Sequence, residues 1–593
     1  MKSRQMWITV ALSLVSIGTF ARQQRPAEPA QAGKGVMVGT VIDGVTNAPI
    51  ANATVNLSAD GNRTRASVIA DDQGRFVFSE APAGRLVLTS DQTGYMTGYY
   101  GYRSPFGANQ YFDLADGEKV TDVVIRMWKN ASVSGTVTDA NHDPVVGASV
   151  VAAPVDVVGG RTAILGGRQV TTDDRGMYRL AGLTPATYAI VMPSPANLTP
   201  VSRGFSASGY PTVFYPDTTA SETASLLTLG GGDDRSGVDF HVTRHPSFSV
   251  SGTVVGRAAG QSRRIELSLR PTRSNRISTS VDVRRTAADA EGHFTFPGVL
   301  PGPYVIEVID VPIEAAPAGT ARMAYSQTGN GMSMIGNALP GRGNALPLPP
   351  APSAPTLWAA VPVALEDGNL DDVQVALVPG ARISGRLVFD GAADKLGEAT
   401  LLSTPVLPMS ADGRELGMLP ASGIRADGSF QTVGLPPGQY QVMFLFNAPG
   451  WSLASIDLGG QEMIARPFEL GATDLTNVVF KFIDHPTQFS GLVTNDAGKP
   501  AGDATIYAFS TDRRSWLSTA PMAAITREVR PARNGTYQMR LPPGEYFVIA
   551  VLETAQQSWR RADALEALAK AAKTAKVAAG QTVTLNLAVA KGK

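Results

Sequence analysis

The sequence predicts an all-β protein: a tandem array of five seven-stranded antiparallel Greek-key β-sandwiches, with one short helix inserted in the last of them. Three observations predict this class. Short segments alternate between apolar and small polar residues, as half-buried strands do. The 61 glycines and 41 prolines among 593 residues suit tight turns between strands. Finally, three strand and turn motifs recur in the same order along the chain.

The first recurring motif is an opening strand built around a glycine. Apolar and small polar residues alternate along it, and a glycine inside such a strand marks a bulge or the close approach of another backbone. A second alternating strand follows, after a proline turn in three copies and without one at residues 265–267 and 399–401. The central glycines are Gly39, Gly135, Gly252, Gly385 and Gly491.

The second and third motifs are turns. A turn containing Asp-Gly, Asn-Gly or a related pair supplies the positive φ of a tight hairpin. The aromatic residue two positions after the turn glycine is predicted to point into the sandwich; these residues are Phe76, Tyr178, Phe294, Phe430 and Tyr537. A Pro-Gly turn then precedes Tyr304, Tyr440 and Tyr546, with a degenerate version at Tyr188 and leucine in place of tyrosine at Leu86. A last alternating strand closes each copy.

These motifs divide the chain into five predicted sandwiches, residues 35–128, 129–244, 245–379, 380–484 and 485–593. Successive motif glycines are on the order of 100 residues apart, which suits a sandwich with its own core. A solenoid repeat is shorter, at ~20–50 residues. We therefore expect an extended array of separately folded units.

Two segments depart from the strand pattern. Residues 311–356 are rich in Gly, Pro and Ala, which predicts a disordered or loosely ordered insertion in the third unit. Within residues 555–579, Ala562, Leu565 and Leu568 recur at helical spacing, which predicts one amphipathic helix before the last strand of the fifth unit. We expect this helix to pack on its own sandwich, with contact to a membrane as the alternative.

The N-terminus has the pattern of an export signal. Lys2 and Arg4 precede a mostly apolar run over residues 7–20, and small residues follow. The run is shorter than the ~20 apolar residues of a spanning helix. We predict a signal peptide at residues 1–21 and a linker at 22–34, hence a periplasmic, outer-surface or secreted protein with no transmembrane segment after cleavage. An uncleaved membrane anchor is the alternative.

Charge and cysteine content exclude several classes of function. The 51 basic residues balance 51 acidic residues, so the chain lacks the basic excess of a nucleic-acid-binding protein, and we expect no nucleic-acid partner. The chain has no cysteine, which excludes disulfides, thiol catalysis and thiolate metal sites. Hydrophobic cores alone must therefore stabilise the units.

Together, the glycine-centred strand, the Asp-x-Gly-x-aromatic turn and the Leu-Pro-Pro-Gly-x-Tyr turn at residues 435–440 and 541–546 resemble those of the carboxypeptidase regulatory-like domain. The resemblance covers nearly the whole chain after the linker. It implies a transthyretin-like (prealbumin-like) sandwich of the carbohydrate-binding-like fold, similar to the collagen-adhesin B-type modules of bacterial surfaces. Carbohydrate is the ligand class that this resemblance implies, although a fold alone does not determine a function.

The chemistry found in proteins with similar domains is missing from this sequence. The peptidase that gives the family its name needs a His-x-x-Glu zinc pair, and no histidine here has a glutamate three residues later; the histidines are His142, His241, His245, His293 and His485. The five opening strands contain no lysine, so the Lys–Asn crosslink of similar adhesins is not expected. A nucleophile elbow and a phosphate loop are also missing. We predict a protein that is not an enzyme, with no catalytic residue, metal site or cofactor.

Aromatic residues concentrate after the core strands of the first unit and recur in the second. Exposed aromatic rings stack on sugars or on partner proteins, so we predict ligand binding by Tyr95, Tyr99, Tyr100, Tyr102, Tyr111, Phe214 and Tyr215. The alternative, which is the more usual outcome, is that these rings pack against their own sandwich. Paired carboxylates such as Asp71–Asp72 are predicted to serve turns; calcium binding is the alternative, but the spacing of a dedicated calcium loop is missing.

The sequence thus predicts an exported, non-catalytic multidomain protein that binds polysaccharide at the cell envelope or has a structural role there. The alternative is a protein-interaction spacer, or an envelope or secretion accessory protein, with no small-molecule ligand. The two interpretations differ in what the aromatic loops contact.

Overall fold

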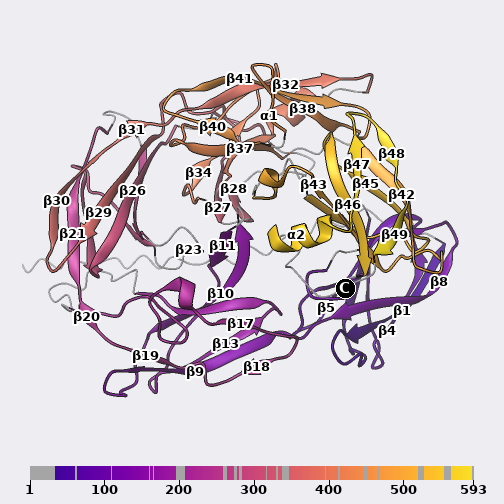
Figure 1. Ribbon diagram of the computed structural model, residues 1–593, viewed down its shortest axis with the longest axis horizontal. Helices are drawn as coiled ribbons and strands as arrows, with labels where there is room; N and C mark the ends of the chain where they lie inside the picture. Colours follow the sequence, from indigo (N-terminus) through magenta and orange to yellow (C-terminus); the bar gives the residue numbers. More distant parts are fainter. Residues whose placement is uncertain are drawn as a thin grey trace, which may run out of the picture.

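The computed structural model shows an all-β protein, as predicted (Figure 1). Among the described residues, α-helix occurs only at α1 (Glu398–Leu402) and α2 (Ala562–Ala569). Neither helix is long and apolar enough to cross a membrane. The structure describes residues 34–59, 63–107, 110–158, 161–164, 166–194, 208–257, 263–272, 277–279, 283–314, 317–328, 331–336, 346–393, 396–411, 414–445, 450–464, 466–517, 526–552 and 562–590. The predicted signal peptide lies outside these residues.

The first unit shows how each sandwich is built. Strand β1 (Gly35–Asp43) lies between β4 (Arg75–Ala81) and β8 (Lys119–Met127) in one sheet. Burial alternates along all of β1, because every second side chain points into the core. The facing sheet contains β3 (Arg63–Ile69), β2 (Thr54–Ala59), β5 (Gly84–Asp91) and β6 (Gly98–Tyr99) in this order, with β7 (Phe112–Leu114) also paired to β5.

The other units repeat this arrangement around their own opening strands. In the second unit the opening strand β9 (Ala131–Asp139) pairs with β13 (Met177–Leu183), β18 (Asp234–Arg235) and β19 (Phe240–Val242), and in the third the opening strand β21 (Phe248–Val255) lies between β25 (His293–Val299) and β30 (Leu370–Ala376). The sheet of the fourth unit has the order β36 (Ser429–Gln431), β32 (Ile383–Asp390), β41 (Leu475–Ile483), β38 (Ser452–Leu458) and β39 (Gln461–Glu462), with β32 as the opening strand. In the fifth unit the opening strand β42 (Gln488–Thr494) pairs with β45 (Thr536–Arg540), β48 (Thr582–Thr584) and β49 (Leu587–Ala590).

The facing layers cover these sheets. In unit 2 the main strands are β10 (Ser149–Val158), β11 (Arg161–Ile164), β12 (Arg168–Thr171), β14 (Thr187–Met192), β16 (Val213–Phe214) and β17 (Leu226–Thr228). In unit 3 they are β22 (Arg263–Pro271), β24 (Arg284–Thr286), β26 (Gly302–Pro312), β29 (Leu357–Leu365) and β31 (Val378–Pro379), and in unit 4 they are β33 (Pro405–Ser410), β35 (Ser422–Gly423), β37 (Gly438–Phe444) and β40 (Phe468–Leu470). In unit 5 they are β43 (Ala504–Ser510), β44 (Thr526–Val529), β46 (Gly544–Leu552) and β47 (Lys573–Val577), and here β49 pairs with both β42 and β46, so the two layers form one continuous sheet. Buried apolar side chains fill each sandwich. We propose the predicted bounds for the five sandwiches and call them units 1 to 5.

The expectation of purely antiparallel sheets is wrong in one respect. In each unit the closing strand runs parallel to the opening strand, as β8 does beside β1, β30 beside β21 and β41 beside β32. Units 2 and 5 do the same with β18, β19, β48 and β49. The chain crosses to the facing sheet and back before the closing strand begins. No hairpin joins the two strands, so nothing requires them to be antiparallel.

The structure explains the glycine of each opening strand. A Cβ atom at Gly385 would lie 1.8 Å from the carbonyl oxygen of Val478 in the neighbouring closing strand. The same clash would arise at Gly39, at 2.4 Å, and at Gly135, at 2.0 Å, with the equivalent carbonyl oxygens. The predicted close approach of a second backbone is therefore confirmed, and any side chain at these positions would push the two strands apart.

The motif aromatics also lie as predicted. The five residues that follow the turn glycines, Phe76, Tyr178, Phe294, Phe430 and Tyr537, are all buried. The tyrosines after the Pro-Gly turns have a further role, because each hydroxyl donates to the carbonyl oxygen four residues earlier. These bonds join Tyr188 to Thr184, Tyr304 to Leu300, Tyr440 to Pro436 and Tyr546 to Pro542, each at 2.8 Å. Each hydroxyl thereby fixes the turn that precedes its strand.

The predicted strand at residues 399–401 is wrong. This segment forms α1, which begins after Gly397 and buries Leu401. Strand β33, which follows α1, pairs with β37 and takes the expected place in the sheet. Three alternating residues are too few to distinguish a strand from one turn of helix.

The expectation of a loosely ordered insertion over residues 311–356 is wrong for the part of it that the structure describes. Strands β27 (Met323–Thr328) and β28 (Gly331–Gly336) form a hairpin, and β27 also pairs with β34 (Leu419–Pro420) of unit 4. The Tyr325 side chain is 1% exposed, and its hydroxyl donates to the carbonyl oxygen of Pro408. The hairpin thus completes the core of the following unit.

The helix predicted at residues 555–579 is shorter than expected. Helix α2 covers Ala562–Ala569, and the residues that follow form β47, which pairs with β46 at the edge of the sheet. Leu565 is buried against Tyr507 and Phe509 of unit 5. The expectation that this helix packs on its own sandwich is confirmed, while residues 553–561 lie outside the described residues.

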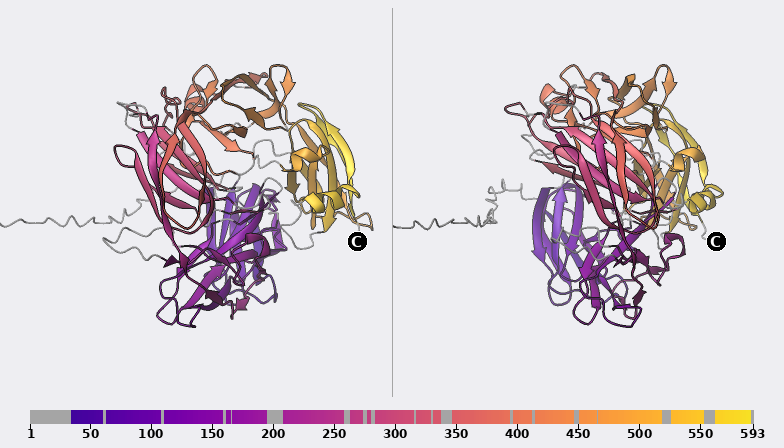
Figure 2. Two further views of the ribbon diagram at one scale, coloured as in Figure 1. Left: turned by 60° about the vertical axis from the view of Figure 1, so that its left-hand side comes forward. Right: turned by 90° about the vertical axis from the view of Figure 1, so that its left-hand side faces the viewer.

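The units are not strung out as an extended array. Figure 1 shows them following one another around a ring, in which unit 5 (yellow) lies beside unit 1 (indigo), and Figure 2 shows the same course from two other directions. Neighbouring units also share contacts. The buried ring of Trp358 in unit 3 donates its indole N–H to the Gly434 carbonyl oxygen of unit 4. The prediction of an extended array of separate units is therefore wrong.

Candidate functional site

The aromatic segment of unit 1 connects β5 to β7 and lies mostly against its own sandwich. Tyr95 and Tyr100 are half-buried and pack on the core of unit 1. The Tyr100 ring meets Phe112 edge-on, with 5.3 Å between the ring centroids. Burial raises the pKa of the Tyr100 hydroxyl. These rings therefore offer little of their faces to a ligand.

Tyr99 and Tyr102 form a pair beside Trp128. Their ring centroids are 5.0 Å apart, and the Tyr102 ring lies 6.5 Å from that of Trp128. Burial, with the nearby Tyr99 and Glu528, raises the pKa of Tyr102 to about 12. Because Glu528 belongs to β44 of unit 5, this pair marks the place where the first and last units meet.

Hydrogen bonds and an ion pair join units 1 and 5 directly. The buried amide of Gln110 donates to the carbonyl oxygens of Pro531, at 2.5 Å, and Gly502, at 3.2 Å. Arg533 pairs with Asp122 through both carboxylate oxygens, at 3.0 and 3.1 Å. The first contact is shielded from water and satisfies two backbone acceptors, whereas the second is exposed to solvent.

Tyr111 differs from the other predicted residues because it lines a cleft between units 1 and 5. The cleft has a volume of about 420 Å³. The Arg85 guanidinium lies over the Tyr111 ring, 3.9 Å from its centroid, a cation–π contact that fixes the ring. Asp113 of β7 and Gln538 of β45 also line this cleft. The site thus combines one aromatic ring with charged and amide side chains.

A further cation forms part of the cleft wall. Arg530 of unit 5 is 6% exposed, and burial lowers its pKa to about 10, with a contribution from the nearby Arg103. The guanidinium therefore stays charged at neutral pH. The sequence pattern gave no signal for Arg530 or Gln538, since both come from a unit more than 400 residues away from Tyr111.

The predicted residues of unit 2 lie apart from this cleft. Phe214 is fully buried beside Val151 and Ala189. Tyr215 is half-buried and meets Phe240 edge-on at 6.3 Å. The structure therefore brings Tyr99, Tyr100, Tyr102 and Tyr111 close to unit 5, whereas Tyr95 lies beside Lys129. Phe214 and Tyr215 stay in their own sandwich.

The paired carboxylates take part in turns. Asp71 Oδ1 accepts the backbone N–H groups of Gln73 and Arg75, and its Oδ2 pairs with the Arg75 side chain at 2.8 Å. Hydrogen bonding, led by the Arg75 N–H, lowers the pKa of Asp71. Asp173 accepts from the equivalent residues of unit 2. No group of three or more candidate metal ligands occurs in the described part of the chain.

Several solved structures resemble parts of the chain. The minor pilin of Streptococcus agalactiae matches at 12% identity with a TM-score of 0.20, over 36% of this chain and 97% of the pilin. A streptococcal ancillary pilin matches at 13% identity and a TM-score of 0.17, over 58% and 99%. The shaft pilin SpaA of Lactobacillus rhamnosus GG matches at 11% identity and a TM-score of 0.17, over 36% and 98%. At such TM-scores we base no conclusion on these likenesses.

The comparison with family models is more specific. No curated protein matches the chain. The model of the carboxypeptidase regulatory-like domain matches residues 36–127 and 132–225, which fall within units 1 and 2. The extension of this resemblance to units 3, 4 and 5 stays a prediction from their motifs. Two segments of this chain, one within unit 1 and one within unit 2, are thus similar to the carboxypeptidase regulatory-like domain.

Proposed function

We propose that this chain is an exported, non-catalytic binding protein that takes a polysaccharide segment into the cleft between units 1 and 5. The observation that carries the proposal is the position of Tyr111 in that cleft, with Arg85 over its ring. Sugar rings have apolar C–H faces that pack on aromatic rings, and hydroxyl groups that bond to carboxylates, amides and guanidiniums. Asp113, Gln538 and Arg530 supply such groups around the ring.

The other predicted tyrosines have a supporting role in this proposal. Tyr99, Tyr100 and Tyr102 pack between the sandwich of unit 1 and the approaching unit 5. They would hold the cleft in shape rather than touch the sugar. The export of the protein, to the periplasm, the outer surface or the medium, is part of the same proposal and follows from the N-terminal pattern.

A glycan array followed by titration of the bound polysaccharide tests the proposal. We expect Tyr111→Ala to weaken binding about tenfold, the effect of losing one aromatic contact. Tyr210→Ala is the matched control, because Tyr210 of unit 2 also packs on an arginine, Arg244, with 5.0 Å between guanidinium and ring centroid, but lies outside the cleft. Binding that is equal in wild type and Tyr111→Ala would refute the proposed site.

A second candidate function is a protein-interaction spacer with no small ligand. It is supported by an apolar groove of about 430 Å³ beside the β27–β28 hairpin. There, Ile313 and Ile335 are 49% and 58% exposed among several prolines. One envelope protein that co-purifies with the full chain in stoichiometric amount, together with no polysaccharide binding, would favour this function over the first.

A further inference from the structure

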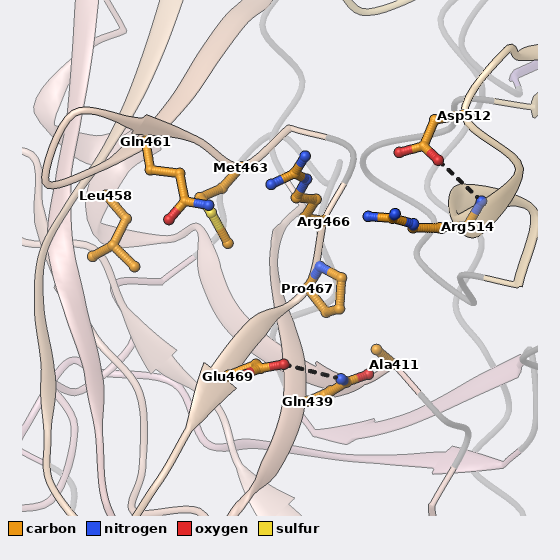
Figure 3. Close-up of a pocket in the computed structure, with 10 residues that line it drawn as sticks. All are labelled: Ala411, Gln439, Leu458, Gln461, Met463, Arg466, Pro467, Glu469, Asp512 and Arg514. Carbon is orange, nitrogen blue, oxygen red and sulfur yellow. Dashed lines mark hydrogen bonds between the residues drawn. The ribbon is translucent and has the colours of Figure 1, made fainter.

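A second cleft lies between units 4 and 5 and is larger than the first, at about 590 Å³ (Figure 3). This volume falls within the range of about 300–1,000 Å³ that small-molecule sites occupy. One wall comes from unit 4, with Gln439 on β37, Glu469 on β40 and Arg466 in the segment before β40. Unit 5 contributes Asp512 and Arg514, from the start of the short 3₁₀ helix at Arg513–Leu517.

Two arginines line this cleft, one from each unit. Figure 3 shows the side chain of Arg514 of unit 5 extending toward Arg466 of unit 4. Neither side chain has an ion-pair partner among the residues that the structure describes. Two like charges in one cleft repel each other, and an anion bound beside both would lower this cost.

The acidic residues of the cleft are engaged elsewhere. Asp512 accepts the backbone N–H of Arg514 at 3.1 Å, and so serves the first turn of its own helix. Glu469 accepts the side-chain amide of Gln439 at 3.5 Å. Neither carboxylate forms an ion pair with Arg466 or Arg514 among the described residues. Both guanidiniums therefore keep donors for a ligand carboxylate, which a planar guanidinium binds through two parallel hydrogen bonds.

The rest of the lining indicates what carries that carboxylate. Gln461 and Gln439 offer amide groups that both donate and accept hydrogen bonds, which suits the hydroxyl groups of a sugar. Leu458, Met463 and Pro467 supply an apolar floor for the C–H face of a ring. Amide groups beside apolar side chains thus suit the polar edge and the apolar face of a sugar ring.

We infer that the cleft between units 4 and 5 binds a uronic-acid residue of an acidic polysaccharide, with Arg466 and Arg514 on its carboxylate. This site is separate from the Tyr111 cleft, and the inference does not depend on it. The protein would therefore distinguish acidic from neutral polysaccharides at its second cleft.

Calorimetric titration of the full chain with trigalacturonate tests the inference. We expect binding that is lost when the sugar carboxylates are methyl-esterified, because the ester keeps the rings and removes the charge. Arg466→Gln and Arg514→Gln should each weaken binding about tenfold, since a hydrogen bond to a charged group contributes about 1.5–3 kcal/mol. Arg386→Gln with Arg540→Gln is the matched control, because it removes two exposed charges from the same units outside the cleft.

Four outcomes would overturn the inference. The first two are that the wild type does not bind trigalacturonate, or that it binds the methyl ester equally well. The third is that the doubly substituted Arg466→Gln/Arg514→Gln chain binds trigalacturonate as tightly as the wild type does. The fourth is that the wild type binds hexaglutamate as tightly as trigalacturonate, and that the double substitution abolishes this binding. The last outcome would assign the cleft to acidic peptides. Tyr111→Ala leaves this cleft intact, so it separates a failure here from a failure of the Tyr111 site.

Discussion

The opening glycines show how a single residue determines the arrangement of two strands. Each lies where the closing strand passes so near that a methyl group would overlap a carbonyl oxygen. The closing strand lies beside the opening strand in parallel, and the register shifts next to Gly39 in unit 1 and Gly385 in unit 4. The glycine therefore allows the closing strand to seal the sandwich.

Gly385→Ala should destabilise unit 4. The new Cβ would lie 1.8 Å from the Val478 carbonyl oxygen, so β32 and β41 would have to separate. We expect a loss of about 2 kcal/mol or more in the free energy of unfolding, the usual cost of overpacking a core. Urea unfolding followed by tryptophan fluorescence, to which Trp451 of this unit contributes, measures it.

Gly471→Ala is the control for that measurement. No atom of the described residues lies within 4 Å of a Cβ placed at Gly471, and its φ is not positive. We expect no destabilisation, because alanine there only restricts the unfolded chain. If Gly385→Ala unfolds at the same urea concentration as Gly471→Ala, the close approach of β41 does not explain the repeated glycine.

At the level of single residues, the sequence predicts the core better than the surface. A turn glycine followed by an aromatic identifies a buried ring in every unit, because both the turn and the burial depend on neighbours within a few residues. The aromatic segment of unit 1 is different. That Tyr111 faces the wall of a cleft depends on unit 5, which approaches from far along the chain, and no local pattern encodes that contact.

At the scale of elements, long alternating strands are predictable and short or inserted ones are not. Strand β1 has nine residues of regular alternation, whereas α1 has five residues in which strand and helix periods cannot be distinguished. The β27–β28 hairpin lies in a segment rich in glycine and proline, so its composition indicates loose order. Its order comes from Tyr325 packing into the next unit, a tertiary contact that overrides composition.

The loop after β33 carries a charged group that should make the junction of units 3 and 4 sensitive to pH. Glu415 faces Arg285 of β24, with 3.9 Å between their charged groups. Glu307 of β26 lies close by and pairs with Arg414 at 3.4 Å and with Arg270 at 3.3 Å. Burial raises the pKa of Glu415, Arg270 and Arg285 oppose this in part, and Glu307 adds to it.

Glu415→Gln should therefore remove part of the pH dependence of stability. A raised pKa means that the folded chain holds the Glu415 proton more tightly than the unfolded chain does. This contribution to stability is complete below pH ~4.5 and is lost as the pH rises through the raised pKa. Glutamine mimics the protonated acid, so the variant should gain stability relative to wild type as the pH increases from 4 to 8. Urea midpoints across this range measure the gain; a constant difference would contradict it.

At the scale of the whole molecule, closure of the ring creates the cleft that Tyr111 lines. The sequence predicts the units because each is encoded locally, but it cannot predict that unit 5 returns to unit 1, since this depends on the angles at four successive junctions. The contact itself is modest. The two hydrogen bonds of Gln110 contribute about 1 kcal/mol each, and an exposed pair such as Arg533 with Asp122 contributes about 0–1 kcal/mol.

Such a contact can be opened by substitution without unfolding the units. We expect Gln110→Ala combined with Asp122→Arg to separate units 1 and 5, because it removes the buried amide and places two arginines face to face. Small-angle scattering should show a larger radius of gyration, and the Tyr111 cleft should lose its ligand because half of its wall moves away.

Asp116→Arg is the matched control, since this exposed residue of unit 1 changes charge equally but lies outside the contact. A second test exchanges the charges: Arg533→Asp added to Asp122→Arg should restore the pair and the compact dimensions, since the reversed pair can form the same bond. An unchanged radius of gyration in the Gln110→Ala/Asp122→Arg chain would mean that other junctions, such as the one through Trp358, hold the ring closed without help from the contact between its ends.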